Sequence, residues 1–445
     1  MPWRSPRKEL FLCAGLDAAG LVLAVAITNL TSKFDLLHPW LIGAVAISYC
    51  LLGWLFGSYT VLRWPWLRLR LVLQRLVLTG LTTVCFIILL SWILGINTSQ
   101  FALLNRQILI VIMGWQTLIA LLIRLQLRAL SQRLPQERWR LMANPDHQIQ
   151  VIREWQRNPF ARHPQFISPE RFADRASKRS RPHSRPEALA LAPGLKLDNG
   201  QRDLITQLQS RGVLITTLEE LAQRQLERLP PSLLPETWLT FTDLAWSSEF
   251  SFQRKLKRMA DIVLASLLLA GFIPIFIVAS LAIWVEDRGP ILYIQTRTGW
   301  MGSHFNLIKM RTMRVSPPGS PTPWTTPRDS RVTKVGGFLR RTRLDEFPQL
   351  INVLRGEMSL IGPRPEQPAM DERLADSIPH YSKRYWMMPG LSGWAQVCGP
   401  GYPSTPEEAE LKLSYDLYYL RNWSFSLDLL ILAKTIKTIL KVKGL

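Results

Sequence analysis

Four long apolar runs in the first third of the chain limit the folds that it can adopt. They occupy roughly residues 10–30, 40–62, 76–96 and 108–123. Most of them are near the length of about 20 residues that a helix needs to cross a hydrocarbon core of about 30 Å. Since unpaired backbone polar groups are costly in lipid, such runs form helices. We therefore expect a bundle of four membrane-spanning helices over residues 1–130.

Basic segments beside these runs predict how the bundle is oriented. The chain has 54 Lys and Arg residues against 33 Asp and Glu residues, a formal net charge of +21. Much of the excess lies before the first run, over 63–75 and over 124–140, whereas 31–35 and 97–100 are short and nearly uncharged. The positive-inside rule then places both ends of the bundle in the cytoplasm. Charge spread between apolar runs also argues against nucleic acid as a partner.

Residues 131–251 are expected to form a basic linker and a reduced α/β unit. The segment 153–185 is rich in Arg, Pro, Ser and His, which is typical of a linker. Beyond it, the pattern predicts strands at 188–192 and 213–215 and an amphipathic helix at 201–209. No G-x-G-x-x-G sequence stands at the first strand-to-helix turn, so a dinucleotide-binding site is not predicted.

A further apolar run, 262–285, is broken by Pro274. Its length would suit a spanning helix. A proline removes a backbone donor and kinks a helix, which suits a helix that enters one leaflet and returns. A fifth crossing would also place everything after Glu286 on the far side of the membrane from the basic segment 254–258. We therefore predict a re-entrant helix over about residues 256–285.

Two adjacent carboxylates, Asp345 and Glu346, precede an apolar helical pattern. One interpretation is a helix N-cap, because Asp is a common capping residue and acids complement the helix dipole. The other is a phosphate site, since cationic donors suited to phosphate oxygens stand nearby at Arg340, Arg341, Arg343 and Arg364. In such a site one carboxylate can attack phosphorus while the other helps to hold Mg²⁺. A capping pair would not require the arginines.

The last part of the chain, residues 252–445, resembles the bacterial sugar transferase family, the monotopic phosphoglycosyl transferases. Those enzymes move a sugar 1-phosphate from a nucleotide diphosphate sugar onto a polyprenyl phosphate. The motifs that carry the resemblance are Lys257-Arg258 with Asp261, the proline-broken helix, Gly289-Pro290, Gln295-x-Arg297-x-Gly299, and the segments 305–313, 343–349, 352–359, 361–365, 389–397 and 415–423. The whole chain is similar to the larger, exopolysaccharide-type members, which place four membrane helices and a Rossmann-like domain before a mostly helical α/β catalytic domain.

The resemblance implies roles for individual residues. Asp345 is implied as the nucleophile that becomes bound to the phosphosugar, and Glu346 as its partner, both at Mg²⁺. Substrate contacts are implied for Arg297, Lys309, Arg340, Arg364 and Pro365, and anchoring of the re-entrant helix for Lys257, Arg258, Asp261 and Pro274. The chain departs from the family at Met388 and at Cys398-Gly399-Pro400, where two positive charges are lost.

The activity implied by the resemblance is transfer of a sugar 1-phosphate from a UDP-sugar to undecaprenyl phosphate, with release of UMP. It would start an exopolysaccharide, capsule or O-antigen at the bacterial inner membrane, with the catalytic domain in the cytoplasm. The expected partners are the nucleotide sugar, the lipid phosphate, the membrane, downstream glycosyltransferases and a second copy of the chain. Two alternatives stay open: a membrane scaffold without catalysis, and a phosphotransferase with a non-sugar nucleotide donor.

Overall fold

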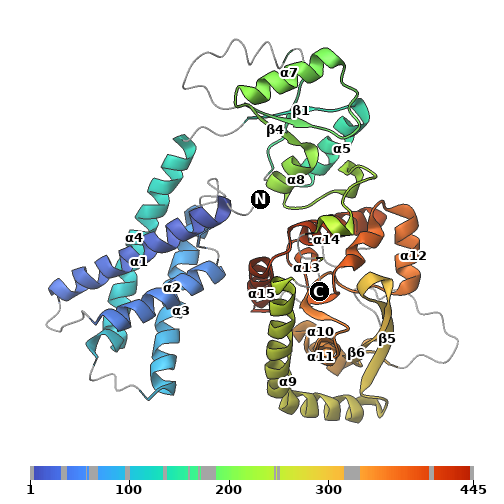
Figure 1. The fold of residues 1–445 in the computed structure, drawn as a ribbon. Helices are drawn as coiled ribbons and strands as arrows, with labels where there is room; N and C mark the ends of the chain where they lie inside the picture. The colour runs from blue at the N-terminus through green and yellow to red at the C-terminus, as the bar shows by residue number, and fades with distance from the viewer. Residues whose placement is uncertain are drawn as a thin grey trace. The chain divides into compact units, whose positions relative to one another are not determined.

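The structure, a computed structural model, is mostly helical with small sheets (Figure 1). It describes residues 5–31, 38–56, 58–59, 69–95, 101–133, 138–158, 161–168, 171, 187–244, 247, 251–314, 331–399 and 405–440. The chain divides into two compact units, Met1–Gln136 and Glu137–Leu445.

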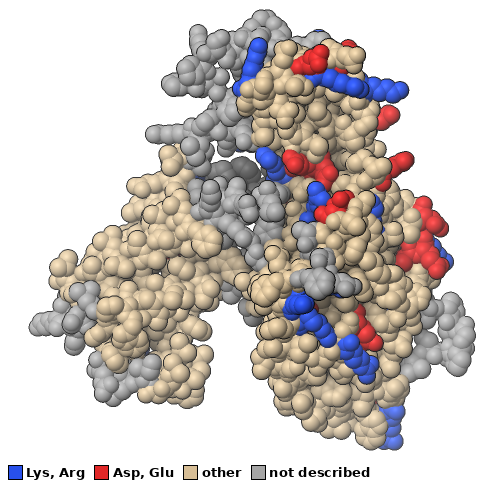
Figure 2. All heavy atoms as spheres, in the orientation of Figure 1, with Lys and Arg blue, Asp and Glu red and all other residues tan. Residues whose placement is uncertain are grey.

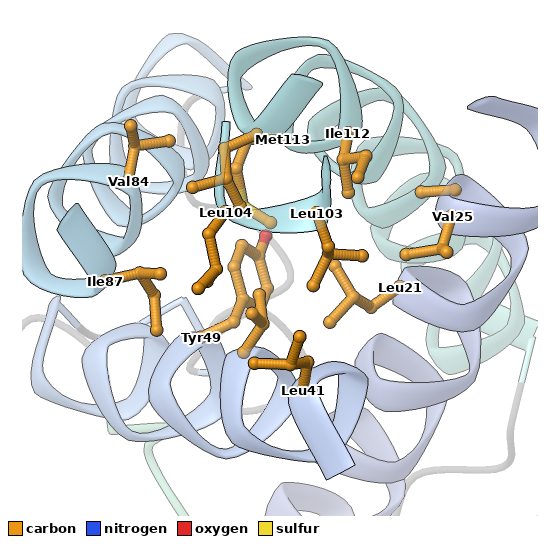
Figure 3. Packing of buried hydrophobic residues seen from close by; sticks show 13 residues of the cluster. Leu21, Val25, Leu41, Tyr49, Val84, Ile87, Leu103, Leu104, Ile112 and Met113 are labelled. Carbon is orange, nitrogen blue, oxygen red and sulfur yellow. The ribbon is translucent and has the colours of Figure 1, made fainter. Parts of the chain in front are cut away.

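The first unit is a bundle of apolar helices. Its elements are α1 (Ser5–Thr31), α2 (Pro39–Phe56), α3 (Leu69–Ile93), the 3-10 turn η1 (Ala102–Leu104) and α4 (Arg106–Arg133). Leucine, valine and isoleucine side chains from all four helices surround Tyr49 in its interior (Figure 3). The outer surface is also apolar, with Leu30, Trp92 and Leu122 exposed, and the face drawn in Figure 2 shows almost no charge on the described atoms of this unit. Helices that are hydrophobic all round are typical of a membrane bundle.

Length and hydropathy distinguish the individual helices. Candidate spans are present in α1, α3 and α4, and α2 contributes a shorter apolar stretch, Pro39–Trp54. The predicted end of the second run at residue 62 is wrong, because α2 ends at Phe56. There the backbone N–H of Ser58 donates to the carbonyl of Gly53 at 2.8 Å and closes the final turn.

The fourth helix also differs from its prediction, because α4 continues to Arg133 rather than ending near residue 123. Arg124 is 1% exposed and makes a two-pronged ion pair with Asp17 of α1, with N–O distances of 2.5 and 2.7 Å. A buried arginine needs such a partner to offset its lost hydration. Arg124 therefore belongs to the interior of the bundle and not to the basic flank from which the orientation was predicted.

The second unit begins with a parallel sheet of strand order β2-β1-β3-β4. Its elements are β1 (Arg138–Met142), α5 (Pro145–Gln156), β2 (Gln165–Phe166), β3 (Glu187–Leu191), α7 (Asn199–Ser210), β4 (Leu214–Thr217) and α8 (Leu218–Leu226). The two predicted strands and the amphipathic helix are thus present as β3, β4 and α7.

The interpretation of 153–185 as a linker is wrong at its start, where α5 continues to Gln156. Trp155 of this helix is fully buried, and Glu154 pairs with the guanidinium of Arg228, which also donates to the Glu154 carbonyl at 2.8 Å. These contacts join α5 to a residue 74 positions away, which a local pattern does not reveal. The parts of the predicted linker at 159–160, 169–170 and 172–185 lie outside the described residues.

The rest of the second unit packs short helices and strand pairs against one side of a long helix (Figure 1). The elements are the 3-10 turns η2 (Pro231–Leu233) and η3 (Phe241–Asp243), then α9 (Phe252–Asp287), β5 (Leu292–Thr298), η4 (Trp300–Gly302), β6 (His304–Met310), α10 (Lys334–Thr342), η5 (Leu344–Glu346), α11 (Gln349–Arg355), β7 (Ser359–Ile361), α12 (Pro368–Ser377), η6 (Tyr381–Trp386), β8 (Gly390–Ser392), α13 (Trp394–Cys398), α14 (Pro406–Asn422) and α15 (Phe425–Leu440). Strands β5 and β6 form an antiparallel hairpin, and β7 pairs with β8 in parallel.

Helix α9 is apolar and long enough to cross a membrane, and it contains Pro274. Figure 1 shows it bending sharply part-way along its length, as a proline inside a helix allows. Near its start, Arg258 donates to the carbonyl of Val353 in α11 at 2.6 Å. Near its end, the Glu286 carboxylate accepts the backbone N–H of Lys334 at the start of α10, at 2.7 Å. Both ends of α9 are therefore bound to elements that flank η5.

Candidate active site

The 3-10 turn η5, between α10 and α11, carries Asp345 and Glu346. Arg343 adopts the left-handed conformation (φ 59°, ψ 16°), which ends α10 and turns the chain into η5. The N-cap residue of α11 is Pro348, so Asp345 is not the cap of this helix. Asp345 is 8% exposed, and among the described residues its Oδ1 has no hydrogen-bond partner. A buried carboxylate oxygen without a donor is costly and indicates a role other than capping.

Glu346 is held by two arginines. Its Oε1 accepts hydrogen bonds from Arg364 at 2.7 Å and from Arg343 at 3.1 Å. Burial alone would raise the pKa of Glu346, but the charges and hydrogen bonds of Arg364 and Arg343 lower it below its usual value. Glu346 is therefore an anion at neutral pH.

Asp345 behaves in the opposite way. Burial, followed by the negative charge of Glu346, raises the pKa of Asp345 to about 6, while the charges of Lys309, Arg340 and Arg343 act against that rise. Neighbouring carboxylates whose pKa values are pushed apart are typical of sites where the two groups have different tasks. Asp345 is ionised at neutral pH and is a stronger base than an exposed aspartate.

Lys309 lies in β6 and contributes to the electrostatics of Asp345. Burial, followed by the positive charges of Arg297 and Arg364, lowers the pKa of Lys309 to about 8. Its ammonium group also lies 5.0 Å from the centre of the Tyr293 ring in β5. The structure thus brings Lys309 into the electrostatic surroundings of Asp345, 36 positions further along the chain.

A fully buried asparagine fixes the strand of Lys309 to the helix that follows Asp345. The Oδ1 of Asn352 in α11 accepts the N–H of Ile308 at 3.1 Å, and its Nδ2 donates to the carbonyl of Asn306 at 2.8 Å. A buried amide that satisfies backbone groups of another element specifies one geometry. Sequence reasoning included Asn352 in a motif but assigned it no role.

Arg340 stands in the last turn of α10, and its Nε donates to the hydroxyl of Thr312 at 2.9 Å. The helix lies very close to the strand end at this point. A Cβ on Gly336 would lie 2.1 Å from the carbonyl oxygen of Thr312, so only glycine fits. This close approach brings Arg340 to the site.

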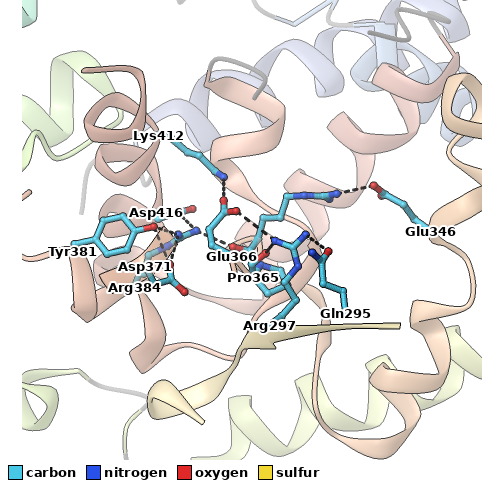
Figure 4. A network of polar contacts seen from close by, with 11 residues as sticks. Gln295, Arg297, Glu346, Pro365, Glu366, Asp371, Tyr381, Arg384, Lys412 and Asp416 are labelled. Atoms are coloured by element: carbon cyan, nitrogen blue, oxygen red, sulfur yellow. Dashed lines mark hydrogen bonds and ion pairs between the residues drawn. The ribbon is translucent and has the colours of Figure 1, made fainter. Parts of the chain in front are cut away.

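Arg297 and Arg384, both labelled in Figure 4, bind the backbone of the loop that contains Pro365. Arg297 of β5 donates to the carbonyl of Pro365 at 3.4 Å and to the side chain of Gln295 at 2.8 Å. Arg384 donates to the carbonyl of Arg364 at 2.8 Å. Arg297 and Arg364 are therefore part of one connected polar network with Glu346.

Sequence reasoning missed the buried half of this network. Arg384, 2% exposed, pairs with Asp416 of α14 at 3.0 Å and donates to the Tyr381 hydroxyl at 2.8 Å. Glu366 follows Pro365 and pairs with Lys412 of α14. Lys412 and Asp416 stand four residues apart on one helix, and that spacing of opposite charges was the available signal.

The residues predicted to anchor the re-entrant helix bind to the protein itself. Lys257 donates to Asp428 of α15 at 2.7 Å and to the carbonyl of Ile361 at 2.9 Å. Asp261 accepts the N–H of Leu360 at 3.1 Å. They join the start of α9 to β7, directly before the loop of Arg364.

The two carboxylates of η5 suit a hard divalent cation. Among the described residues there is no cluster of three or more His, Cys, Asp or Glu side chains that could enclose a metal. Mg²⁺ does not need one, because it is commonly bound through one or two carboxylates together with substrate phosphates. The Oδ1 of Asp345, which has no hydrogen-bond partner in the described part of the chain, and the adjacent anion of Glu346 fit that arrangement.

An apolar groove of about 680 Å³ lies between α9 and α10. Its lining includes Pro274, Val278, Phe338 and Leu344. Leu344 is the residue before Asp345, so the groove reaches η5. A groove of this composition suits a hydrocarbon chain.

Comparisons with known proteins identify the family to which this chain belongs. A sequence profile described as bacterial sugar transferase matches residues 252–442. A UDP-glucose:undecaprenyl-phosphate glucose-1-phosphate transferase from Caulobacter vibrioides is 44% identical over 185 residues, which cover 41% of this chain and 69% of the relative. The chain belongs to the bacterial sugar transferase family.

Two further relatives in this family differ in the sugar that they are named for. An Escherichia coli protein with the same name as the Caulobacter relative is 43% identical over 184 residues, covering 41% of this chain and 40% of the relative. A UDP-N-acetylgalactosamine-undecaprenyl-phosphate N-acetylgalactosaminephosphotransferase from Aeromonas hydrophila is 40% identical over 185 residues, which cover 42% of this chain and 44% of the relative. The chain thus matches less than half the length of these two relatives.

Proposed function

We propose that this protein transfers a sugar 1-phosphate from a UDP-sugar to undecaprenyl phosphate and releases UMP. The observation that carries the proposal is the buried Asp345 carboxylate, whose Oδ1 has no partner among the described residues, beside a glutamate held by arginines. It lies in the part of the chain that matches the family, and the relatives' names supply both substrates.

In the first step, an oxygen of Asp345 attacks the phosphorus that bears the sugar. A bond forms between that oxygen and phosphorus, the bridging bond to the second phosphate breaks, and UMP leaves with the electron pair. Arg364, Lys309 and Arg340 provide positive charge for the phosphate oxygens. Mg²⁺, held by Glu346 and Asp345 with phosphate oxygens, would neutralise negative charge on the diphosphate.

In the second step, a phosphate oxygen of undecaprenyl phosphate attacks the same phosphorus. The bond to Asp345 breaks, the free carboxylate returns, and the sugar diphosphate lipid is the product. A covalent intermediate lets a water-soluble donor and a lipid acceptor use the site in turn.

The contacts of α9 support the membrane placement that we propose. Both ends of this helix are bound to elements that flank η5, which suits a helix that enters and leaves one leaflet, with the catalytic part in the cytoplasm. The acceptor's chain would lie in the groove that Leu344 lines. As a multi-pass protein of the bacterial inner membrane, the enzyme would start exopolysaccharide, capsule or O-antigen synthesis.

An assay of membrane fractions with undecaprenyl phosphate and a panel of UDP-glucose, UDP-galactose and their N-acetylated forms tests the proposal. We expect UMP release with at least one donor, and in the absence of lipid acceptor we expect sugar-labelled phosphate to stay on the protein at Asp345. CDP-glycerol in the panel, which would release CMP, tests a non-sugar donor. Release of a nucleotide monophosphate from no donor would favour the scaffold, and label on another residue would reject Asp345 as nucleophile.

The pH dependence of the first step should follow Asp345. Only the ionised carboxylate attacks phosphorus, so the single-turnover rate of UMP release should rise with pH and level off above about 6. If the protonated Lys309 assists, the rate should fall again above about 8, and Lys309→Met should remove that falling limb. A rate that does not change between about pH 5 and about pH 7 would contradict the assignment.

A further inference from the structure

A cavity of about 840 Å³ lies in the α/β part of the second unit, away from the residues of η5. It is lined by the carboxyl ends of β1 and β2, by residues 195–197 after β3, and by Gln148 and Gln201 of α5 and α7. Small-molecule pockets in proteins commonly have volumes of about 300–1,000 Å³. The size therefore suits a ligand as large as a nucleotide.

The cavity occupies a distinctive point in the topology of the sheet. The chain runs from β1 through α5 to β2 at one edge, and from β3 through α7 to β4 at the other. Strands β1 and β3 are neighbours, and the strands that follow them in the chain, β2 and β4, lie at opposite edges of the sheet. The connections after β1 and β3 therefore leave in opposite directions and open a crevice between the loops that follow these two strands. Open parallel sheets bind ligands at such a point, outside the carboxyl ends of the strands.

The packing of the sheet agrees with this topology. Leu141 and Ala190 join the apolar cluster that contains Trp155 of α5, whereas Leu189 joins the one that contains Leu208 of α7. The two helices thus cover opposite faces of the sheet, as right-handed crossovers in opposite directions require.

The lining of the cavity is positively charged. It includes Arg140, Arg171 and Lys196, and none of its described lining residues is a carboxylate. Arg140 is 6% exposed, and its guanidinium donates to the side-chain oxygen of Gln165 in β2. This contact orients the guanidinium at the edge of the cavity. Such a lining favours an anion, above all one with phosphate groups.

The other lining residues suit an organic group next to the anion. Met142, Phe166, Leu195 and Leu197 supply apolar surface, and an aromatic ring can stack on a base. The turn after β1 reads Ala143-Asn144-Pro145 and has no glycine. A glycine-rich loop therefore does not hold the phosphates here, and cationic side chains would do so.

We propose that this cavity binds a nucleoside phosphate, with its phosphates at Arg140, Arg171 and Lys196 and its base beside Phe166. This inference does not rest on the proposed transferase activity, since no residue of η5 contributes to the cavity.

Photo-crosslinking of the full-length protein in phosphatidylcholine nanodiscs tests the inference, with azido derivatives of UMP and ATP as probes. We expect crosslinks on peptides that contain residues 138–143, 165–168 or 195–201, whatever labelling the catalytic part shows. Lys196→Glu should weaken this labelling by about tenfold or more, the effect of losing a charge-assisted contact and adding repulsion. Arg202→Glu is a matched control, because Arg202 is also exposed on the same unit but does not line the cavity.

Three results would overturn the inference. Labelling confined to residues 252–440 would place the only nucleotide site in the catalytic part. Equal labelling of the Lys196→Glu and Arg202→Glu variants would show that the cavity's charge plays no part. If inorganic phosphate reduced the labelling as effectively as unlabelled nucleotide, the nucleoside would be rejected and the cavity would be a site for plain phosphate. If phosphatidylglycerol did so, the cavity would be a site for a lipid headgroup.

Discussion

Replacement of Asp345 by asparagine should lower the rate of UMP release by about 10⁴-fold or more, the scale of losing a covalent nucleophile. The two side chains have nearly the same shape, but an amide oxygen does not attack phosphorus at a useful rate. Because Oδ1 of Asp345 has no partner among the described residues, the change breaks no hydrogen bond at that atom, and the fold should be retained. A 10⁴-fold loss corresponds to about 5.5 kcal/mol of transition-state stabilisation.

Two variants make this result interpretable. Asp376→Asn removes a carboxylate that is exposed on α12 and should leave activity unchanged. Glu346→Gln keeps the nucleophile but removes the anion that Arg364 and Arg343 bind, so we expect an intermediate loss of about 10²–10³-fold. The thermal midpoint of each purified variant should be measured alongside. An Asp345→Asn enzyme that releases UMP within tenfold of the wild-type rate would remove Asp345 from the mechanism.

The local part of the candidate site could be predicted from the sequence. Asp345 and Glu346 are adjacent, and the helical pattern after them and the glycine–proline loop of Arg364 are both visible in short segments. Their separation into a carboxylate of raised pKa and one of lowered pKa could not be predicted. It depends on burial and on Arg364 reaching back 18 positions to Glu346, and both are consequences of tertiary packing.

The fold shows the same limit. Apolar runs indicated α1 to α4, because long hydrophobic stretches carry a strong local signal. The partner of a buried charge has no such local signal in the sequence. Arg124 was counted among the basic flanks, although Asp17, 107 positions away, binds it inside the bundle. The end of helix α5 was missed for a related reason. Arg153 and Glu154 stand at the start of the segment interpreted as a linker, and the sequence does not reveal that Glu154 pairs with the distant Arg228.

The largest effect on stability should come from Arg384→Met. The substitution leaves Asp416, which is 2% exposed, without its arginine. Breaking a buried ion pair by removing one partner typically costs about 3–5 kcal/mol of the free energy of unfolding. Thermal or denaturant unfolding of the detergent-purified protein should show this loss, whereas Arg373→Met, at an exposed position of α12, should show almost none. A change of less than about 1 kcal/mol would mean that the pair contributes little.

The double variant Arg384→Met, Asp416→Leu separates the structural role of this arginine from its effect on the site. With both charges removed, no uncompensated carboxylate is left at position 416, so most of the lost stability should return. Activity should not return with it. Arg384 also donates to the carbonyl of Arg364, and without that bond Arg364 is held less firmly where it meets Glu346. A double variant that regains full kcat/KM together with its Tm would show that Arg384 serves the fold alone and does not position the loop for catalysis.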